Sequence, residues 1–315
     1  MLPEYITGTL KTPVGDVWQI ATRWSRYDLW STIKVRWNLG RMNYSVKPGL
    51  YATGSPDENS NVFVTANFKL SFDHLRRELH GLDAWIQVLD TKGINVWCAA
   101  GKGTFGTKEL IYRIKAHDLN KLVVQRKIIV PQLGAVGVSA HEIYDRTGFY
   151  VIYGPVKASD ITNFVRSGLK AGQEMRRVRF PMNERLKLIP VELTFGWLYL
   201  VFVAAVFFVL SGLSLNGYSV DDAWNKGGLA VLNLLTAYLA GCVVTPALLP
   251  WVPFRRFSVK GLIVGWGLAI ALYFLTGLGN SIIEIVSWFL IMGGISSFLA
   301  MNFTGSSTYT SLSGV

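Results

Sequence analysis

Four long apolar stretches near the C-terminus constrain the fold of this chain more than any other feature. A transmembrane helix needs roughly 20 mostly apolar residues to cross a hydrocarbon core of about 30 Å. Residues 193–315 hold four Lys or Arg and three Asp or Glu, whereas the first 192 residues hold 27 and 17. The sequence therefore predicts a soluble domain followed by an all-α transmembrane domain over 193–315. The four predicted spans are 193–215, 227–253, 261–279 and 282–303.

Lys and Arg residues beside the spans predict their orientation. Basic residues gather in a predicted juxtamembrane linker, 176–192, and between the second and third spans, whereas the loop between the first two contains Asp221 and Asp222. The start of the chain has neither a basic region nor an apolar core, so no signal peptide is expected. We expect a multi-pass protein of the inner, cytoplasmic membrane, with the soluble domain and both termini in the cytoplasm.

The soluble part alternates between strand-like and helix-like segments. Residues 1–60 form a predicted strand-rich lead-in packed on a globular domain over 61–175. That domain has predicted strands at 61–67, 83–90, 122–130 and 149–154, and predicted helices at 71–81 (capped by Ser71), 107–117, 139–148 and 159–169, while 94–101 fits either. This alternation predicts an α/β, Rossmann-like domain around a mostly parallel sheet, whose ligands bind at the carboxyl ends of the strands.

Several familiar motifs are absent or incomplete. Gly101, Gly103 and Gly106 spell GxGxxG, but no acidic residue follows at the distance that dinucleotide binding requires. The four histidines lack metal-ligand spacing. The basic residues are scattered, so anionic membrane lipid is the expected partner and nucleic acid is not. Cys98 and Cys242 are too few for an iron–sulfur cluster of the chain's own, so any one-electron chemistry needs an outside donor.

Cys98 is the one cysteine of the soluble part. A lone cysteine among apolar residues is usually an inert buried side chain. Here Lys102 follows four residues later and shares the face of Cys98 if the segment is helical. A nearby ammonium and a helix N-terminus both favour the thiolate, which is a strong ligand for soft metals.

The run NVWCAAGK (95–102), within GINVWCAAGKGTFGTKEL, resembles the signature of the corrinoid protein of microbial mercury methylation. That family is a membrane-anchored relative of the large subunit of the corrinoid iron–sulfur protein of the acetyl-CoA pathway. Residues 48–76 and the C-terminal NFTGSSTYTSLSGV resemble it too, although the family commonly has five membrane helices and four are predicted here.

The resemblance implies a base-off, cobalamin-type corrinoid bound by residues 61–175. It implies that Cys98 is the catalytic residue and the lower axial ligand of cobalt. By motif position, its cap consists of Asn95, Val96, Trp97, Ala99, Ala100, Gly101 and Lys102. The ends of the predicted strands add six candidate cofactor-binding residues, Thr65, Asn67, Thr104, Gly134, Gly137 and Gly154.

The activity that the resemblance implies is transfer of a cobalt-bound methyl group to Hg(II), which forms methylmercury. The implied partners are a ferredoxin-like 4Fe–4S protein as electron donor and a methyl-donor protein or methyl-folate. Two alternatives stay open. One is a corrinoid methyl carrier for an acceptor of the acetyl-CoA-pathway type, and the other is a non-catalytic membrane metal-binding or transport protein, although the spans lack the row of charges typical of ion pathways.

Overall fold

The computed structural model describes residues 3–303 apart from 216, 278 and 280, so most of the C-terminal NFTGSSTYTSLSGV lies outside the described residues. The chain divides into two compact units. The first contains the residues up to 178 apart from 36–38, and the second contains 36–38 and the residues from 179 onward.

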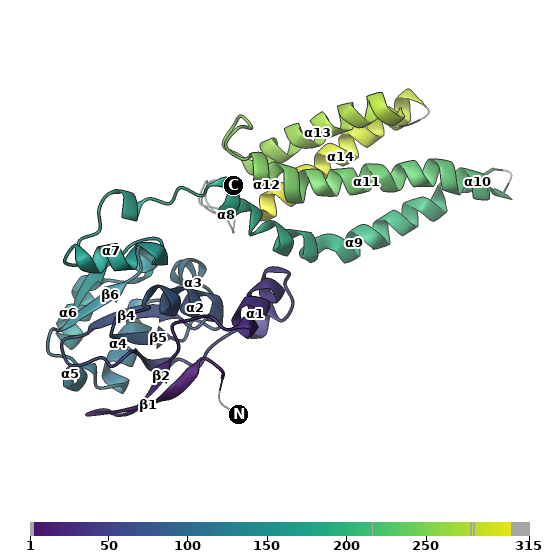
Figure 1. Ribbon diagram of the computed structural model, residues 1–315. Helices are drawn as coiled ribbons and strands as arrows, with labels where there is room; N and C mark the ends of the chain where they lie inside the picture. The colour runs from purple at the N-terminus through teal and green to yellow at the C-terminus, as the bar shows by residue number, and fades with distance from the viewer. Residues whose placement is uncertain (1–2, 216, 278, 280, 304–315) are drawn as a thin grey trace. The chain divides into compact units, whose positions relative to one another are not determined.

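A seven-stranded, mostly parallel sheet forms the centre of the first unit (Figure 1). Its order is β1-β2-β3-β5-β4-β6-β7. The strands are β1 Ile6–Thr12, β2 Gly15–Ile20, β3 Gly49–Thr53, β4 Asn61–Ala66, β5 Ala84–Leu89, β6 Lys127–Val130 and β7 Tyr150–Tyr153. Strands β5, β4, β6 and β7 are parallel, whereas β3 pairs antiparallel with β5 and β1 with β2. The predicted α/β, Rossmann-like fold is confirmed, and the strands of the N-terminal 60 residues extend the same sheet.

Helices cover both faces of this sheet. Phe72 and Leu75 of α2 (Lys69–Glu78) pack with Phe63 on one face, together with Phe164 of α7 (Ile161–Arg166). The other face carries the helices α3 (Val96–Lys102), α4 (Thr107–Ala116) and α6 (Ala140–Thr147), which pack with Val62, Val64 and Ala66 of β4. The side chains of β4 thus alternate between two apolar cores.

Two local expectations need correction, and one open assignment is settled. The strand predicted over 122–130 is wrong in its first half, because Arg126 has a left-handed φ of 48° and the extended ladder begins at Lys127. Leu122 and Val123 are apolar because they pack in the core, not because they pair in the sheet. Ser71 is not a helix cap, because α2 begins two residues earlier, directly after Phe68. The ambiguous segment 94–101 forms helix α3.

The remaining short elements of this unit connect the larger ones. They are α1 Arg26–Arg36, η1 Arg41–Asn43, α5 Leu119–Leu122, η2 Gln132–Gly137, η3 Ala158–Asp160 and η4 Glu174–Arg176.

The second unit contains four helices that are long and apolar enough to cross a membrane, over Met182–Leu210, Val220–Leu248, Phe257–Thr276 and Ile282–Asn302 among the described residues. The first joins α8 (Met182–Leu186) to α9 (Ile189–Leu210), and a short β8–β9 hairpin (Leu213–Ser214 and Gly217–Tyr218) follows it. The second runs through α10 (Val220–Asp222), η5 (Ala223–Gly227), α11 (Gly228–Leu239), η6 (Ala240–Val244) and α12 (Thr245–Leu248), and η5 and η6 are π-helical. The last two are α13 (Phe257–Thr276) and α14 (Ile282–Asn302).

The expected four helices are confirmed, but their predicted ends shift. The first span stops at Leu210 instead of 215, and the second stops at Leu248 instead of 253. Just beyond this end, the Lys260 ammonium donates hydrogen bonds to the carbonyl oxygens of Leu249 and Val252, at 2.5 and 2.6 Å. Helices α13 and α14 pack closely at Gly261, where a Cβ would lie 2.5 Å from the carbonyl oxygen of Ser296.

Candidate functional site

The order of the parallel strands places a ligand edge between β4 and β6. The chain passes from β4 through α2 to β5 on one side, and then crosses back through α3–α5 to β6 on the other side. At such a switch point the loops at the carboxyl ends of the strands separate and leave room for a ligand. The segments that leave this edge are the loop after β4, the β5–α3 loop (residues 90–95), η2 and the turn after β7.

Helix α3 carries Cys98 on its outer face. The Asn95 side chain caps the helix, because its Oδ1 accepts a hydrogen bond of 3.0 Å from the backbone N–H of Cys98. The helix ends at Gly103, whose φ of 80° suits a glycine C-cap. Its inner residues, Val96, Ala99 and Ala100, are buried, whereas Trp97 and Cys98 are half-buried. The sulfur therefore belongs to the accessible side of α3.

Gly101 leaves open space beside Cys98. It follows Cys98 by three residues, so both lie on one helix face. A Cβ at Gly101 would meet no atom within 4 Å, and both Gly101 and Lys102 are exposed. A flat group can therefore approach the backbone of α3 next to the sulfur.

Gly134 and Gly137 support the same helix from its buried side. A Cβ at Gly137 would lie 2.2 Å from the carbonyl oxygen of Phe105 and 3.2 Å from the Cα of Ala100. One at Gly134 would lie 2.4 Å from the Phe105 ring. These two candidate residues thus pack η2 against α3. Phe105, which is fully buried between them, was missed from sequence, although it is the one aromatic residue in the glycine-rich run GKGTFG.

Asn67 holds the loop that leads to α3. Its buried Oδ1 accepts hydrogen bonds from the backbone N–H groups of Thr91 and Gly93, at 3.0 and 2.9 Å. The Thr91 hydroxyl lies 2.8 Å from the same oxygen and 2.6 Å from the carbonyl oxygen of Ile94. This arrangement, which we call the Asn67 latch, ties the end of β4 to the β5–α3 loop.

The other candidate residues occupy different surroundings. Thr104 is half-buried and its N–H donates to the carbonyl oxygen of Ala99 at 3.0 Å, so it belongs to the end of α3. Thr65 is buried and shares the strand face of Phe63, which is the side covered by α2. Gly154 is buried after β7, where a Cβ would lie 3.1 Å from Ile129. The structure thus brings residues 95–102 together with Thr104, Gly134, Gly137 and the Asn67 latch, and places Thr65 and Gly154 in buried strand ends.

The described residues contain no group of three or more His, Cys, Asp or Glu side chains able to hold a metal ion. Cys98 and Cys242 are both free thiols, and Cys242 is buried within the second apolar helix. Of the two, Cys98 is the sulfur that a ligand at the switch point can reach.

Fold and site together define a Rossmann-like domain with an accessible cysteine helix at its ligand edge, and the comparisons with known proteins fall in this region. Residues 20–165 match the family described as "CO dehydrogenase/acetyl-CoA synthase delta subunit". The "Corrinoid/iron-sulfur protein large subunit" of Moorella thermoacetica is 35% identical over 126 residues, which cover 39% of this chain and 28% of that protein.

Archaeal proteins match the same region. The "Acetyl-CoA decarbonylase/synthase complex subunit gamma" of Methanopyrus kandleri is 33% identical over 122 residues, covering 38% of this chain and 26% of that protein. Its namesake from Methanocaldococcus jannaschii is 32% identical over 129 residues, covering 40% and 26%. The α/β domain is therefore related to the large subunit of the corrinoid/iron–sulfur protein, while the match spans little more than a quarter of these relatives.

Proposed function

We propose that this chain is a membrane-anchored, corrinoid-dependent methyltransferase with Cys98 as the lower axial ligand of cobalt in a base-off corrinoid. One observation carries the proposal: the half-buried sulfur of Cys98 lies on the open face of a helix at the switch point of a domain related to a corrinoid/iron–sulfur protein. When bound, the corrinoid supplies a methyl group on cobalt that is passed to an acceptor.

The residues around Cys98 suit that group. A cysteine thiolate is a soft donor that fits cobalt. A Cβ at Gly101 would meet no atom within 4 Å, and the half-buried Trp97, which precedes Cys98, could supply an apolar surface for the cofactor. Asn95 fixes the first turn of α3, while the Asn67 latch fixes the loop before it. The protein's contribution is thus ligation, orientation and a firmly held sulfur.

The finer proposal names the acceptor and the partners. We take Hg(II) as the methyl acceptor, and a ferredoxin-like 4Fe–4S protein and a methyl-donor protein or methyl-folate as the partners. The sequence run 95–102 supports this choice through its resemblance to the mercury-methylation family. Four membrane-compatible helices support an anchor, which we assign to the inner membrane with both termini in the cytoplasm.

A second candidate function is a methyl carrier in acetyl-CoA metabolism. The names of the relatives, which include subunits of acetyl-CoA decarbonylase/synthase complexes, favour it. Product analysis separates the two candidates: the full chain with a methylated corrinoid and Hg(II) yields methylmercury under the first, and no methylmercury under the second.

The ligand role of Cys98 is tested by spectroscopy of the full chain loaded with corrinoid. We expect the absorption signature of sulfur–cobalt bonding in the wild-type protein, and its loss together with methyl transfer in Cys98→Ala. Cys242→Ala is the matched control, because Cys242 is buried in an apolar helix, and it should keep both. Methyl transfer by the Cys98→Ala variant at the wild-type rate would reject the ligand role.

A further inference from the structure

Helix α1 turns polar residues toward the domain and exposes large apolar residues to solvent. Its buried residues are Asp28, Ser31 and Val35, so two of the three residues that face the domain are polar. Large apolar residues occupy its solvent side instead. This arrangement is the reverse of an ordinary surface helix, which turns its apolar stripe toward the core.

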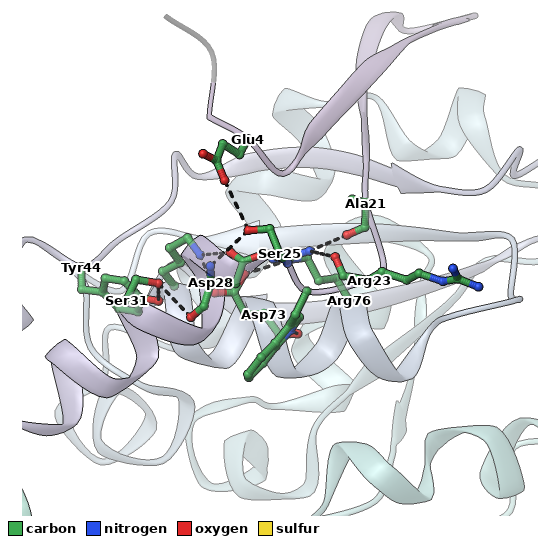
Figure 2. Close-up of polar contacts among 11 residues, drawn as sticks. Glu4, Ala21, Arg23, Ser25, Asp28, Ser31, Tyr44, Asp73 and Arg76 are labelled. Carbon is green, nitrogen blue, oxygen red and sulfur yellow. Dashed lines mark hydrogen bonds and ion pairs between the residues drawn. The ribbon is translucent and has the colours of Figure 1, made fainter.

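Buried ion pairs fix this orientation. The Asp28 carboxylate is bound by Lys69 and Arg76 of α2, each at 2.8 Å, and Ser31 Oγ lies 2.7 Å from the hydroxyl of Tyr44. Figure 2 shows Asp28 directed toward Arg76, and Ser31 toward Tyr44. Both cations also bind Asp73 of α2. Because removing one partner of a buried ion pair is strongly unfavourable, α1 is not free to roll its apolar side inward.

Large apolar side chains are also exposed in the segment that follows, and together with those of α1 we call them the α1 face. Its six large side chains are between 49 and 88% exposed in the structure. They are Tyr27, Leu29, Trp30, Ile33, Leu39 and Met42. Scattered apolar residues are normal on a protein surface, but a cluster of this kind marks an interaction site.

The charge around the α1 face selects an anionic partner. Between Asp16 and Asp57 the chain contains six basic residues and one acidic residue, Asp28, and the Glu4 carboxylate accepts a hydrogen bond from Ser25 just before α1. The Asp28 carboxylate is buried and paired with Lys69 and Arg76, so it presents little charge to solvent. With Trp30, Leu29 and Ile33 exposed beside the exposed Arg26 and Lys34, α1 offers both apolar contact and positive charge to an anionic bilayer.

The connection to the second unit keeps a bilayer within reach. Only residues 179–181 separate the first unit from the first apolar helix, Met182–Leu210, and an extended chain covers at most about 3.5 Å per residue. A domain tethered so closely to a membrane span meets lipid at high effective concentration. A soluble acidic partner is not held near the domain by such a tether.

We propose that the α1 face binds the surface of the membrane in which the chain is anchored, with its aromatic residues in the headgroup layer and its basic residues on anionic lipid. The proposal goes beyond the methyl-transfer function and does not depend on it. It makes α1 a second membrane attachment, in addition to the four apolar helices.

Hydrogen–deuterium exchange of the full chain tests this. The chain is reconstituted in nanodiscs of phosphatidylcholine alone, in nanodiscs that also contain phosphatidylglycerol, and in detergent. We expect α1 amides to exchange about tenfold more slowly in the phosphatidylglycerol nanodiscs, and high salt to remove much of this protection. Trp30→Glu combined with Ile33→Glu should abolish it, whereas Tyr112→Glu, at an exposed aromatic residue of α4, should not.

Equal exchange of α1 in all three environments would overturn the proposal. Protection that rises with protein concentration would also overturn it, since that result assigns the α1 face to a second copy. If Trp30→Glu combined with Ile33→Glu loses protection throughout the sheet, that variant is unfolded. The test then uses Arg26→Glu combined with Lys34→Glu, because these residues are exposed and their replacement leaves the apolar side chains in place. Loss of the lipid-dependent protection in this variant supports the proposal, and its retention overturns it.

Discussion

Two buried polar clusters of the α/β domain hold different helices, and they do so by different means. The Asn67 latch secures the loop before α3 with neutral hydrogen bonds. The cluster of Asp28, Lys69, Asp73 and Arg76 secures α1 on α2 with four charges. The first holds the loop that leads to the helix carrying Cys98, and the second attaches one helix to another.

The contrast teaches that strong electrostatic perturbation is a poor guide to the site in this domain. Burial raises the pKa of Asp28, but hydrogen bonds from Lys69, Ser25 and Arg76 outweigh it and lower the pKa from 3.8 to about 2. A search for perturbed carboxyl groups would therefore choose Asp28, because such groups cluster at functional sites in many enzymes. Here the perturbed carboxylate holds a helix in place.

The largest effect on stability is expected from Asp28→Ala. Removal of this carboxylate leaves Lys69 and Arg76 with less compensation in a buried site. We expect a loss of about 3–5 kcal/mol in the free energy of unfolding, measured by chemical denaturation. Methyl transfer per folded molecule should stay close to wild type. A selective loss of activity without a loss of stability would give this cluster a chemical role and break the contrast.

Asn67→Leu, in contrast, should affect the cofactor site as well as the stability of the domain. The change leaves the N–H groups of Thr91 and Gly93 without their acceptor, at a cost of about 1–3 kcal/mol. Because the latch positions α3, the sulfur–cobalt signature should weaken as well. Gln87→Leu is the matched control, since Gln87 is a buried polar residue of β5 that bonds His117 and the carbonyl of Gly49. It should destabilise the domain and leave the signature of the folded fraction unchanged.

Two glycine substitutions distinguish residues that pack behind α3 from residues that leave its outer face open to a ligand. Gly137→Ala should destabilise the domain by about 1–3 kcal/mol, because the new methyl group collides with Phe105 and forces η2 away from α3. Gly101→Ala should stabilise α3 by up to about 1 kcal/mol, because alanine is the better helix former and the site is open. The same methyl group should nevertheless weaken corrinoid binding, measured by titration. Unchanged affinity in Gly101→Ala would place the ligand on another face.

The smallest effect concerns pH. A carboxyl group whose pKa is lowered by folding contributes stability above its unfolded pKa, near 4, and loses it as the pH falls toward 2. We therefore expect the unfolding midpoint of the wild-type chain to decrease over this interval. The decrease should be smaller in Asp28→Asn, which has no carboxyl group at this position to protonate. Parallel pH profiles for the two proteins would show that Asp28 does not contribute this term.

The sequence predicted those features that repeat along the chain. Apolar runs gave the four long helices, and the alternation of strands and helices gave the α/β domain. The motif around Cys98 predicts a site in 95–102, although the periodicity of this segment fits either a helix or a strand. The ends of elements were less certain, since a single residue such as Arg126, with its left-handed backbone, shortened a strand.

Contacts between residues that are distant in the sequence could not be predicted from local patterns. Asn67 was expected to face a ligand, yet its oxygen is occupied by a loop 24 residues away. Gly134 and Gly137 were expected to admit a ligand, and their neighbours turn out to be Phe105 and Ala100. The inverted polarity of α1 depends on Arg76, which no local pattern connects to Asp28. Spacing reports the period of an element, whereas these roles depend on its tertiary neighbours.

The Asn67 latch has a mechanical consequence. It connects the ends of two adjacent parallel strands to the short run that precedes Cys98, and α3 packs into the core through Ala99 and Ala100, together with Phe105. A sulfur mounted in this way has little freedom to travel. A corrinoid bound at this edge would therefore meet a cysteine that the latch holds at a fixed position on the domain.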